Sequence, residues 1–104
     1  MFQRSGDVPI GVPSNMIQYA ALTMMLAQVT GYEVGEYVHT ISDAHIYVDQ
    51  IPAVEEIIKR ETFAFPTMTL TNPSKDFTEF RHTDFTLGDD YQSGEAMKEI
   101  PVAI

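Results

Sequence analysis

The pattern of hydrophobic and polar positions predicts several short strands and one long helix. Residues 1–7 are expected to form a short strand or strand end, and residues 8–13 an irregular connection with two prolines. From Ser14 to about Thr30 good helix formers dominate, and the glycine that follows is a typical left-handed helix stop. Apolar residues occupy every face of this helix, which is typical of a buried helix. We therefore expect more protein around it than a few short strands can supply.

The middle of the chain predicts strands followed by a second helix. Residues 33–48 carry β-branched and aromatic residues with partial alternation, so we expect one or two strands with a break near Ile41–Ser42. Asp49 can cap a helix that runs to about Arg60, with Pro52 tolerated in its first turn. This helix is expected to be amphipathic and to cover a core with one apolar stripe. The stripe consists of Ile51, Val54, Ile57 and Ile58.

Two further strands and a tail are expected toward the C-terminus. Residues 67–71 alternate between apolar side chains and threonines, and residues 83–87 are expected to form the last strand. Residues 88–104 are expected to be a mobile tail with an apolar end. Together the elements predict one α+β domain over residues 1–104. It is sandwich-like, with a mixed or antiparallel sheet packed on a long buried helix.

Charge and composition exclude several classes of partner and chemistry. Six Lys and Arg against fifteen Asp and Glu give a formal charge of −9, which argues against nucleic acid or an anionic membrane as partner. The chain has no cysteine, so it holds no disulfide, no thiolate zinc site and no cysteine nucleophile. Residues 8–32 carry no charge, but polar side chains interrupt this run too often for a membrane span. A signal-peptide pattern is missing, and a cytoplasmic location is expected.

The polar segment before the long helix has the residue types of an anion site. Arg4 is the only Lys or Arg in the first half of the chain, and it can offer a planar two-donor fork to a phosphate or carboxylate. Ser5 adds a hydroxyl, and nearby glycines let backbone N–H groups approach a ligand. Ser14 or Asn15 can cap the helix that follows. An ordinary strand–turn–helix connection with a surface arginine is the alternative interpretation.

A second group of polar residues lies on the predicted strand in the middle of the chain. His45 and Tyr47 are two residues apart, so their side chains point to the same face, and Asp43 joins them if the strand is regular. Two hydrogen-bonding rings on one face suit a sugar hydroxyl, which donates to one and accepts from the other. The alternative is a buried tyrosine with a satisfied histidine. A metal site from His39, Asp43 and His45 would lack the further ligands that zinc usually takes, and no metal is expected.

The order of these residues resembles a known family. Arg-Ser-x-Asp-x-x-x-Gly-x-Pro-x-Asn, preceded by Gln, occupies residues 3–15 and resembles the nucleotide-binding signature of the thymidylate synthases. The resemblance recurs at residues 43–47, Asp-Ala-His-Ile-Tyr, and at residues 101–104, Pro-Val-Ala-Ile. It covers the C-terminal part of the family's usual length. The nucleophilic cysteine, its neighbouring histidine, the general-base glutamate and the phosphate-binding arginines of a partner subunit would all lie upstream of Met1.

The resemblance implies a nucleotide site. By this resemblance Arg4 and Ser5 hold the 5′-phosphate of dUMP, and His45 and Tyr47 hold the 3′-hydroxyl of the sugar. Asn15 is expected to select the base, because its amide both donates and accepts and so matches O4 and N3–H of uracil.

The resemblance also implies a folate site beside the base. Asp7 would lie near the base and the pterin ring and serve in proton transfer or folate placement, and Gly11 would line the folate. Val102 and Ala103, with the carboxylate of Ile104, would belong to a mobile closing tail, residues 88–104, that folds over bound ligands and excludes water. The implied reaction converts dUMP and 5,10-methylenetetrahydrofolate into dTMP and dihydrofolate, after a thiolate attacks C6 of the base.

Two departures from the family pattern keep alternatives open. Ser14 stands where the family has a large aromatic residue that packs on folate, and residues 92–95, Gln-Ser-Gly-Glu, replace a Pro-His-Pro pattern after Tyr91. A pyrimidine nucleotide hydroxymethylase of the same family therefore remains an alternative, and so does a nucleotide-binding module without catalysis. We expect this chain alone to be inactive. It would work with a missing N-terminal half or a partner subunit, in a homodimer that binds dUMP and reduced folate.

Overall fold

The computed structural model describes residues 1–97 and 99–102, and the chain forms two compact units. The first unit contains Met1–Tyr19, Val38–Thr62 and the C-terminal residues from Gly94 on. The second unit contains Ala20–Tyr37 and Phe63–Ser93.

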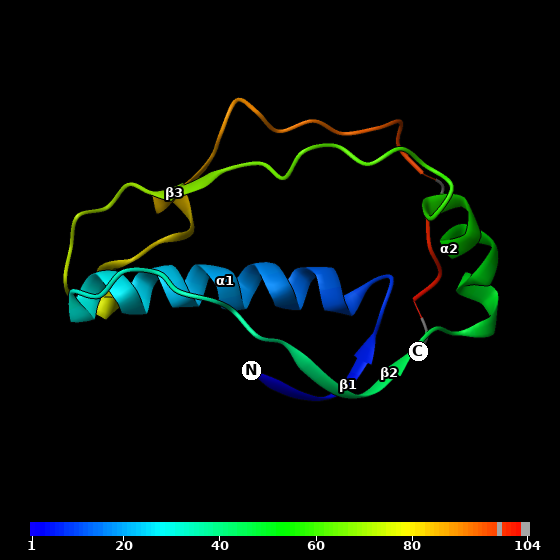
Figure 1. The fold of residues 1–104 in the computed structure, drawn as a ribbon, viewed down its shortest axis with the longest axis horizontal. Helices are drawn as coiled ribbons and strands as arrows, with labels where there is room; N and C mark the ends of the chain where they lie inside the picture. The colour runs from blue at the N-terminus through cyan, green and yellow to red at the C-terminus, as the bar shows by residue number, and fades with distance from the viewer. Residues whose placement is uncertain (98, 103–104) are drawn as a thin grey trace. The chain divides into compact units, whose positions relative to one another are not determined.

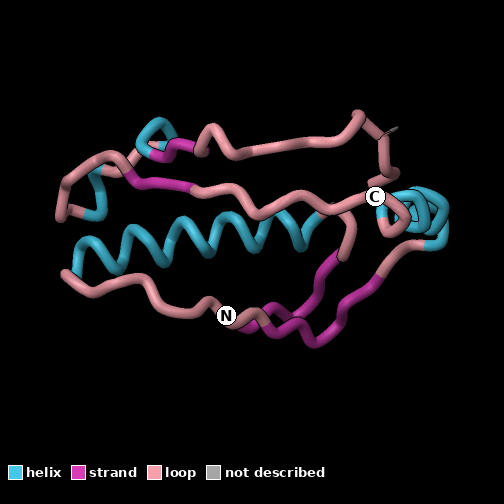
Figure 2. The backbone as a smooth tube through the Cα atoms, turned by 45° about the horizontal axis from the view of Figure 1, so that its top comes forward, coloured by secondary structure: helices cyan, strands magenta, loops and turns pink. Residues whose placement is uncertain are grey.

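A parallel pair of strands forms the sheet of the first unit. Strand β1 (Phe2–Asp7) pairs along its length with strand β2 (Thr40–His45). Helix α1 (Gly11–Thr30) lies between them in sequence, as the crossover that parallel strands require. The two strands run side by side in Figures 1 and 2. The strand predicted within residues 1–7 is confirmed.

Helix α1 begins earlier than its sequence suggests. It starts at Gly11, so the expected caps at Ser14 and Asn15 are wrong, and both residues lie inside the helix. The Asp7 carboxylate instead accepts a hydrogen bond from the backbone N–H of Ile10, with 3.2 Å between N and Oδ1. A proline in the first turn is tolerated because its missing N–H would have had no partner within the helix.

The end of α1 agrees with the sequence, and the helix is little buried within the described residues. Gly31 has φ +78°, which is the left-handed conformation expected of a helix stop. Within the described residues, Ala27 is the only buried residue of the helix, so these residues by themselves do not bury it, and its burial by further protein remains a prediction. Its large exposed apolar side chains are Met16, Ile17, Tyr19 and Leu26.

The strand and the helix in the middle of the chain are shorter than predicted. Strand β2 runs through Ile41–Ser42 without the expected break, because pairing with β1 supports it there. The second helix is shorter than expected: a 3₁₀ turn (Val48–Gln50) precedes α2 (Ile51–Ile57). Pro52 lies in the first turn of α2 as predicted, whereas Asp49 belongs to the 3₁₀ turn and does not cap α2. The expected cover stripe is largely exposed here, at Ile51, Ile57 and Ile58.

The second unit contains an antiparallel strand pair and a hydrogen-bonded loop. Strand β3 (Met68–Leu70) pairs with β4 (Phe85–Leu87), which confirms both strands predicted near the C-terminus. Between them the chain makes two short 3₁₀ turns, Phe77–Glu79 and His82–Asp84. The side chain of Gln28 on α1 donates to two carbonyl oxygens of this loop.

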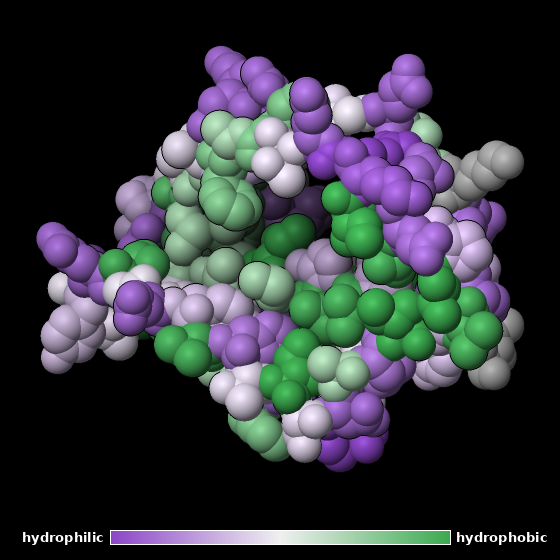
Figure 3. All heavy atoms as spheres, turned by 45° about the vertical axis from the view of Figure 1, so that its right-hand side comes forward, coloured by the Kyte–Doolittle hydropathy of each residue, from purple (hydrophilic) through white to green (hydrophobic). Residues whose placement is uncertain are grey.

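Much apolar surface is left uncovered. Within the described residues the buried apolar side chains are Ala27 and Phe80, and hydrophobic residues show on the face drawn in Figure 3. Exposed apolar surface on this scale is typical of interaction sites and ligand-binding grooves. In the part of the chain that is described, no helix is at once long and apolar enough to cross a membrane. The mixture of helices and small sheets confirms the α+β class.

Candidate functional site

Arg4 and Ser5 lie next to one another on β1 but make different contacts. Arg4 is exposed, and among the described residues its side chain has no hydrogen-bond or ion-pair partner, so its two-donor fork is free for an anion. Ser5 is half-buried, and its hydroxyl donates to the carboxylate of Asp43 on β2, with 3.3 Å between Oγ and Oδ2. The register explains this contact, because Ser5 faces Asp43 across the parallel pair. A phosphate that used the Ser5 hydroxyl would have to replace Asp43 as its acceptor.

Asn15 is held by a short chain of side-chain hydrogen bonds. Its Oδ1 accepts from Gln3 Nε2 at 3.0 Å, and Gln3 Oε1 lies 2.8 Å from His39 Nε2. Gln3 Nε2 also donates to the carbonyl of Ser5 at 2.8 Å. These bonds orient the Asn15 amide, and with respect to the described residues the second lone pair of its oxygen and its two N–H donors remain for a ligand. The supporting role of Gln3 was not predicted, although Gln3 opens the sequence motif.

Asp7, Gly11 and Asn15 come together where β1 leads into α1. A Cβ atom at Gly11 would lie 3.8 Å from Asn15 Oδ1 and 3.9 Å from Asp7 Cβ. Glycine therefore leaves the space between these two polar side chains open. The structure thus brings the expected base-reading residue beside both residues expected on the folate side.

The rings of His45 and Tyr47 meet edge to face. Their centroids are 5.0 Å apart, and the ring planes are inclined by 78°. His45 is the last residue of β2, and its Nδ1 lies 3.3 Å from the carbonyl oxygen of Asp43 and 3.6 Å from the Asp43 carboxylate. His39, the third member of the metal cluster considered above, contacts Gln3. Within the described residues, no three His, Cys, Asp or Glu side chains gather closely enough to hold a metal ion.

Gln50 connects parts of the site that are distant in sequence. It is fully buried, and its Nε2 donates to Asp7 Oδ2 and to the carbonyl of Pro101, each at 2.9 Å. Its Oε1 accepts from the backbone N–H of Tyr47 at 3.0 Å. One side chain therefore touches a residue of each of the three motifs. Sequence reasoning missed it, because a polar residue in a short turn is ordinarily exposed.

The C-terminal segment is described only in part. Pro101 contacts Gln50, and Val102 is 63% exposed, so Val102 covers little of the protein in this structure. The predicted folate contact at Ala103 and the terminal carboxylate of Ile104 lie outside the described residues.

Two perturbed carboxyl groups lie away from these motifs, in the loop of the second unit. The Thr78 hydroxyl and backbone N–H donate to Asp76 and lower its pKa. The Asn72 amide and the backbone N–H of Arg81 donate to Asp84 and lower its pKa.

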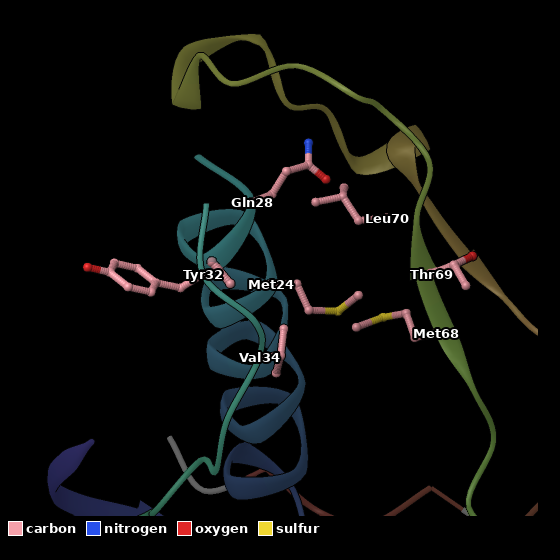
Figure 4. A pocket seen from close by; sticks show the side chains of 8 residues that line it. Met24, Gln28, Tyr32, Val34, Met68, Thr69 and Leu70 are labelled. Atoms are coloured by element: carbon pink, nitrogen blue, oxygen red, sulfur yellow. The ribbon is translucent and has the colours of Figure 1, made fainter. Parts of the chain in front are cut away.

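An open pocket of about 350 Å³ also lies in the second unit. Figure 4 shows the side chains of Met24 on α1 and Met68 on β3 pointing toward one another, while the ring of Tyr32 points away. None of the predicted site residues lines this pocket. Its lining consists of Met24, Ala27, Gln28, Tyr32, Val34, Met68, Thr69 and Leu70.

Comparison with known proteins decides the family. The model of the thymidylate synthase family matches residues 1–104, which is the whole chain. The chain belongs to the thymidylate synthase family. It is 42% identical to the thymidylate synthase of Mycoplasma mobile over 98 residues, which is 94% of this chain and 34% of that protein. Among solved structures it is similar to a thermostable thymidylate synthase A from Bacillus subtilis, with a TM-score of 0.83 and 39% identity. That match covers 95% of this chain and 36% of the Bacillus protein.

Family membership confirms the resemblance seen in the sequence motifs. Thymidylate synthases are transferases of nucleotide biosynthesis, and as a family they bind dUMP and use methylenetetrahydrofolate as cosubstrate. The chain spans about a third of the length of the two relatives named above. The substrate and folate sites of a thymidylate synthase are therefore assigned to these residues as a proposal.

Proposed function

We propose that this chain is the dUMP- and folate-binding C-terminal part of a thymidylate synthase. One observation carries the proposal. The three sequence motifs converge in the first unit, where Gln50 bonds to Asp7, to Tyr47 and to Pro101. If the three motifs resembled those of the family only by chance, their residues would not be expected to meet around one buried amide.

The nucleotide's phosphate and sugar are assigned to β1 and β2. Arg4, exposed and without a partner among the described residues, binds the 5′-phosphate through its guanidinium fork. Ser5 supplies a second contact once its hydroxyl turns from Asp43. His45 and Tyr47, whose rings touch, bind the 3′-hydroxyl. A hydroxyl that donates to one ring and accepts from the other satisfies both partners.

The base is assigned to Asn15. The Asn15 amide is already oriented by Gln3, so little side-chain freedom is lost when uracil binds. Its N–H group donates to O4 of the base, and its oxygen accepts from N3–H.

The folate is assigned to Asp7, Gly11 and the C-terminal segment. Asp7, held by Gln50, serves in proton transfer or in placing the pterin. Gly11 leaves room for the folate, and Val102 and Ala103 close over it in residues 88–104, the segment that we propose to be the closing tail.

The reaction needs residues that this chain does not contain. Methylation of dUMP by 5,10-methylenetetrahydrofolate gives dTMP and dihydrofolate and begins with attack of a thiolate on C6 of the base. The chain has no cysteine, so the thiolate comes from another segment or subunit, and the chain alone is inactive. A homodimer and a cytoplasmic location belong to the same proposal. The exposed apolar surface supports the need for such packing.

The proposal is tested with a fusion protein, in which residues 1–104 follow the N-terminal two thirds of the Mycoplasma mobile enzyme. The expected result is dTMP formation from dUMP and methylenetetrahydrofolate, with no product when the cysteine nucleophile of the Mycoplasma part is changed to serine. A folded fusion protein that binds neither dUMP nor folate would contradict the proposal and favour a segment that has lost its site.

The hydroxymethylase alternative is favoured by one residue. Ser14 is exposed on α1 and has no aromatic ring to pack on folate. Without that ring, water has easier access to the one-carbon unit that would otherwise take a hydride. Mass analysis of the product from the same fusion protein separates the two reactions. A methyl group indicates a thymidylate synthase, and a hydroxymethyl group indicates the alternative.

A further inference from the structure

Gln50 is the only buried polar side chain in the described part of the chain. It is 0% exposed, whereas Asp7 and Tyr47, two of its three partners, are half-buried and exposed respectively. Burial of an amide is costly unless its groups are paired. All of its polar atoms are paired here: Nε2 donates to Asp7 and Pro101, and Oε1 accepts from Tyr47.

The three bonds require an amide at this position. The two N–H groups on one nitrogen serve two acceptors, the carboxylate of Asp7 and the carbonyl of Pro101. A glutamate would keep an acceptor for the Tyr47 N–H but would lose both donors and place its own charge against Asp7. An asparagine would keep the amide but is one methylene shorter.

The two donor bonds depend on one another. If the C-terminal segment leaves, one N–H of the buried amide loses its acceptor, and an unpaired buried donor costs free energy. The amide then turns or becomes hydrated, and its bond to Asp7 weakens. Conversely, an Asp7 carboxylate in place holds the amide in the orientation that receives the carbonyl of Pro101.

We propose that Gln50 is a positioning residue that couples the Asp7 carboxylate to docking of the C-terminal segment. The catalytic consequence of this coupling rests on the proposed function, in which Asp7 acts on the base or the folate. The contact itself is independent of the ligand. Gln50 would therefore link placement of the reacting groups to closure of the site over them.

The experiment uses the fusion protein that restores the missing upstream part. Gln50→Glu and Gln50→Asn are compared with a matched control, Gln28→Glu. Gln28 also uses one nitrogen to donate to two acceptors, the carbonyls of Asn72 and Ser74 at 2.7 and 2.6 Å, but these lie in the second unit. The control removes the same number of donors without touching Asp7 or Pro101.

The expected result is that hydrogen exchange, KM for the folate and kcat change, whereas the affinity for dUMP does not. For Gln50→Glu, amide hydrogen exchange over residues 96–102 becomes roughly tenfold faster. The KM for methylenetetrahydrofolate rises roughly tenfold, and kcat falls roughly tenfold. The Kd for dUMP stays within about threefold of its value in the unaltered protein. Gln50→Asn shows the same split to a smaller degree. Gln28→Glu lowers the melting midpoint and leaves exchange over residues 96–102, KM and kcat unchanged.

Other outcomes overturn the inference. If Gln50→Glu lowers only the melting midpoint, while exchange, KM and kcat match the unaltered protein, Gln50 is a purely structural residue. If Gln50→Glu does not fold, Gln50→Asn decides the question by the same measurements. If the unaltered fusion protein shows neither dUMP binding nor turnover, the proposed function fails. The exchange measurement still decides the coupling, because unchanged exchange in the Gln50 variants contradicts it.

Discussion

Gln3 Nε2 donates to Asn15 Oδ1 at 3.0 Å and so connects β1 to the first turns of α1. Gln3 is held in turn by His39, which contacts its Oε1. The amide that is proposed to select the base is therefore fixed by residues that need not touch the nucleotide. Orientation by a supporting side chain is a common way to prepare a binding group.

Replacement of Asn15 is expected to change the choice of base. Cytosine presents an amino donor at C4 and a bare acceptor at N3, so the unmodified site leaves polar groups facing like groups. Unpaired buried groups cost roughly 1–3 kcal/mol each. Asn15→Asp should weaken dUMP binding and relatively favour dCMP, because a carboxylate accepts from the amino group and, when protonated, donates to N3. Titration of both nucleotides against the fusion protein and its variant measures this. If the ratio of the dUMP and dCMP affinities is unchanged in the variant, Asn15 does not contact the base.

Arg4→Lys is expected to weaken phosphate binding. Lysine keeps the charge but loses the planar fork, and we expect a loss of about 1–2 kcal/mol in dUMP affinity. Deoxyuridine, which has no phosphate, serves as the control ligand and should bind almost equally to both proteins. Equal losses for dUMP and deoxyuridine would place Arg4 away from the phosphate.

The 104-residue chain by itself is expected to lack synthase activity and to be a poor monomer. It has no thiol, and few of its apolar side chains are buried within the described residues. An assay of dTMP formation and sedimentation of the purified chain in dilute solution test the two statements. Robust turnover, or a compact monomer with a high unfolding midpoint, contradicts the expectation.

A methyl group at Gly6 is expected to disturb the contact between β1 and α1. A Cβ atom there would lie 2.9 Å from Val12 Cγ2 and 3.2 Å from Gln3 Nε2, which is too close without movement. Gly6→Ala should lower the free energy of unfolding of the fusion protein by about 1–3 kcal/mol. Gly35→Ala is the matched control, because nothing lies within 4 Å of its Cβ position. Urea unfolding of both variants measures the difference, and equal midpoints would contradict the close packing.

Acid is expected to loosen the loop of the second unit. The folded pKa values of Asp76 and Asp84 lie below the ordinary value of 3.8. Their contribution to stability is therefore fully present above that value and is lost as pH falls from 3.8 through the folded pKa. Carboxyl NMR titration should show both shifts, and amide exchange in the loop should accelerate over that interval.

A control for this acid effect comes from neighbouring carboxyl groups. Asp76→Asn should reduce the acid response, because an amide oxygen accepts from Thr78 at every pH. Asp89→Asn should leave it unchanged, since Asp89 accepts no hydrogen bond among the described residues. An equal response in both variants would assign the acid effect to other groups.

The features that the sequence predicted well depend on local chemistry. Helix α1 ends at Thr30, just before Gly31 in the left-handed conformation, and alternation of threonine with apolar residues marks β3. The family motif likewise consists of side chains close in sequence, so the proximity of Asp7, Gly11 and Asn15 follows from a short connection.

The features that it missed depend on contacts between distant residues. The strand β2 is continuous because β1 pairs with it, and α1 begins at Gly11 with the help of the Asp7 carboxylate. The role of Gln50 could not be predicted, because its partners Asp7 and Pro101 lie 43 and 51 residues away in the chain. Burial of α1 was predicted from its all-round apolar pattern, but among the described residues only Ala27 of this helix is buried.

The parallel pairing of β1 with β2 has a consequence for synthesis on the ribosome. Phe2 pairs with Thr40, so β1 emerges well before the strand that completes its backbone hydrogen bonds. At about 5–20 residues per second the delay is on the order of seconds, long compared with the microseconds in which a helix such as α1 forms. During this interval the N–H and C=O groups of β1 that pair with β2 are therefore without that partner. Those seconds are the period in which a chaperone or a misplaced strand can reach it first.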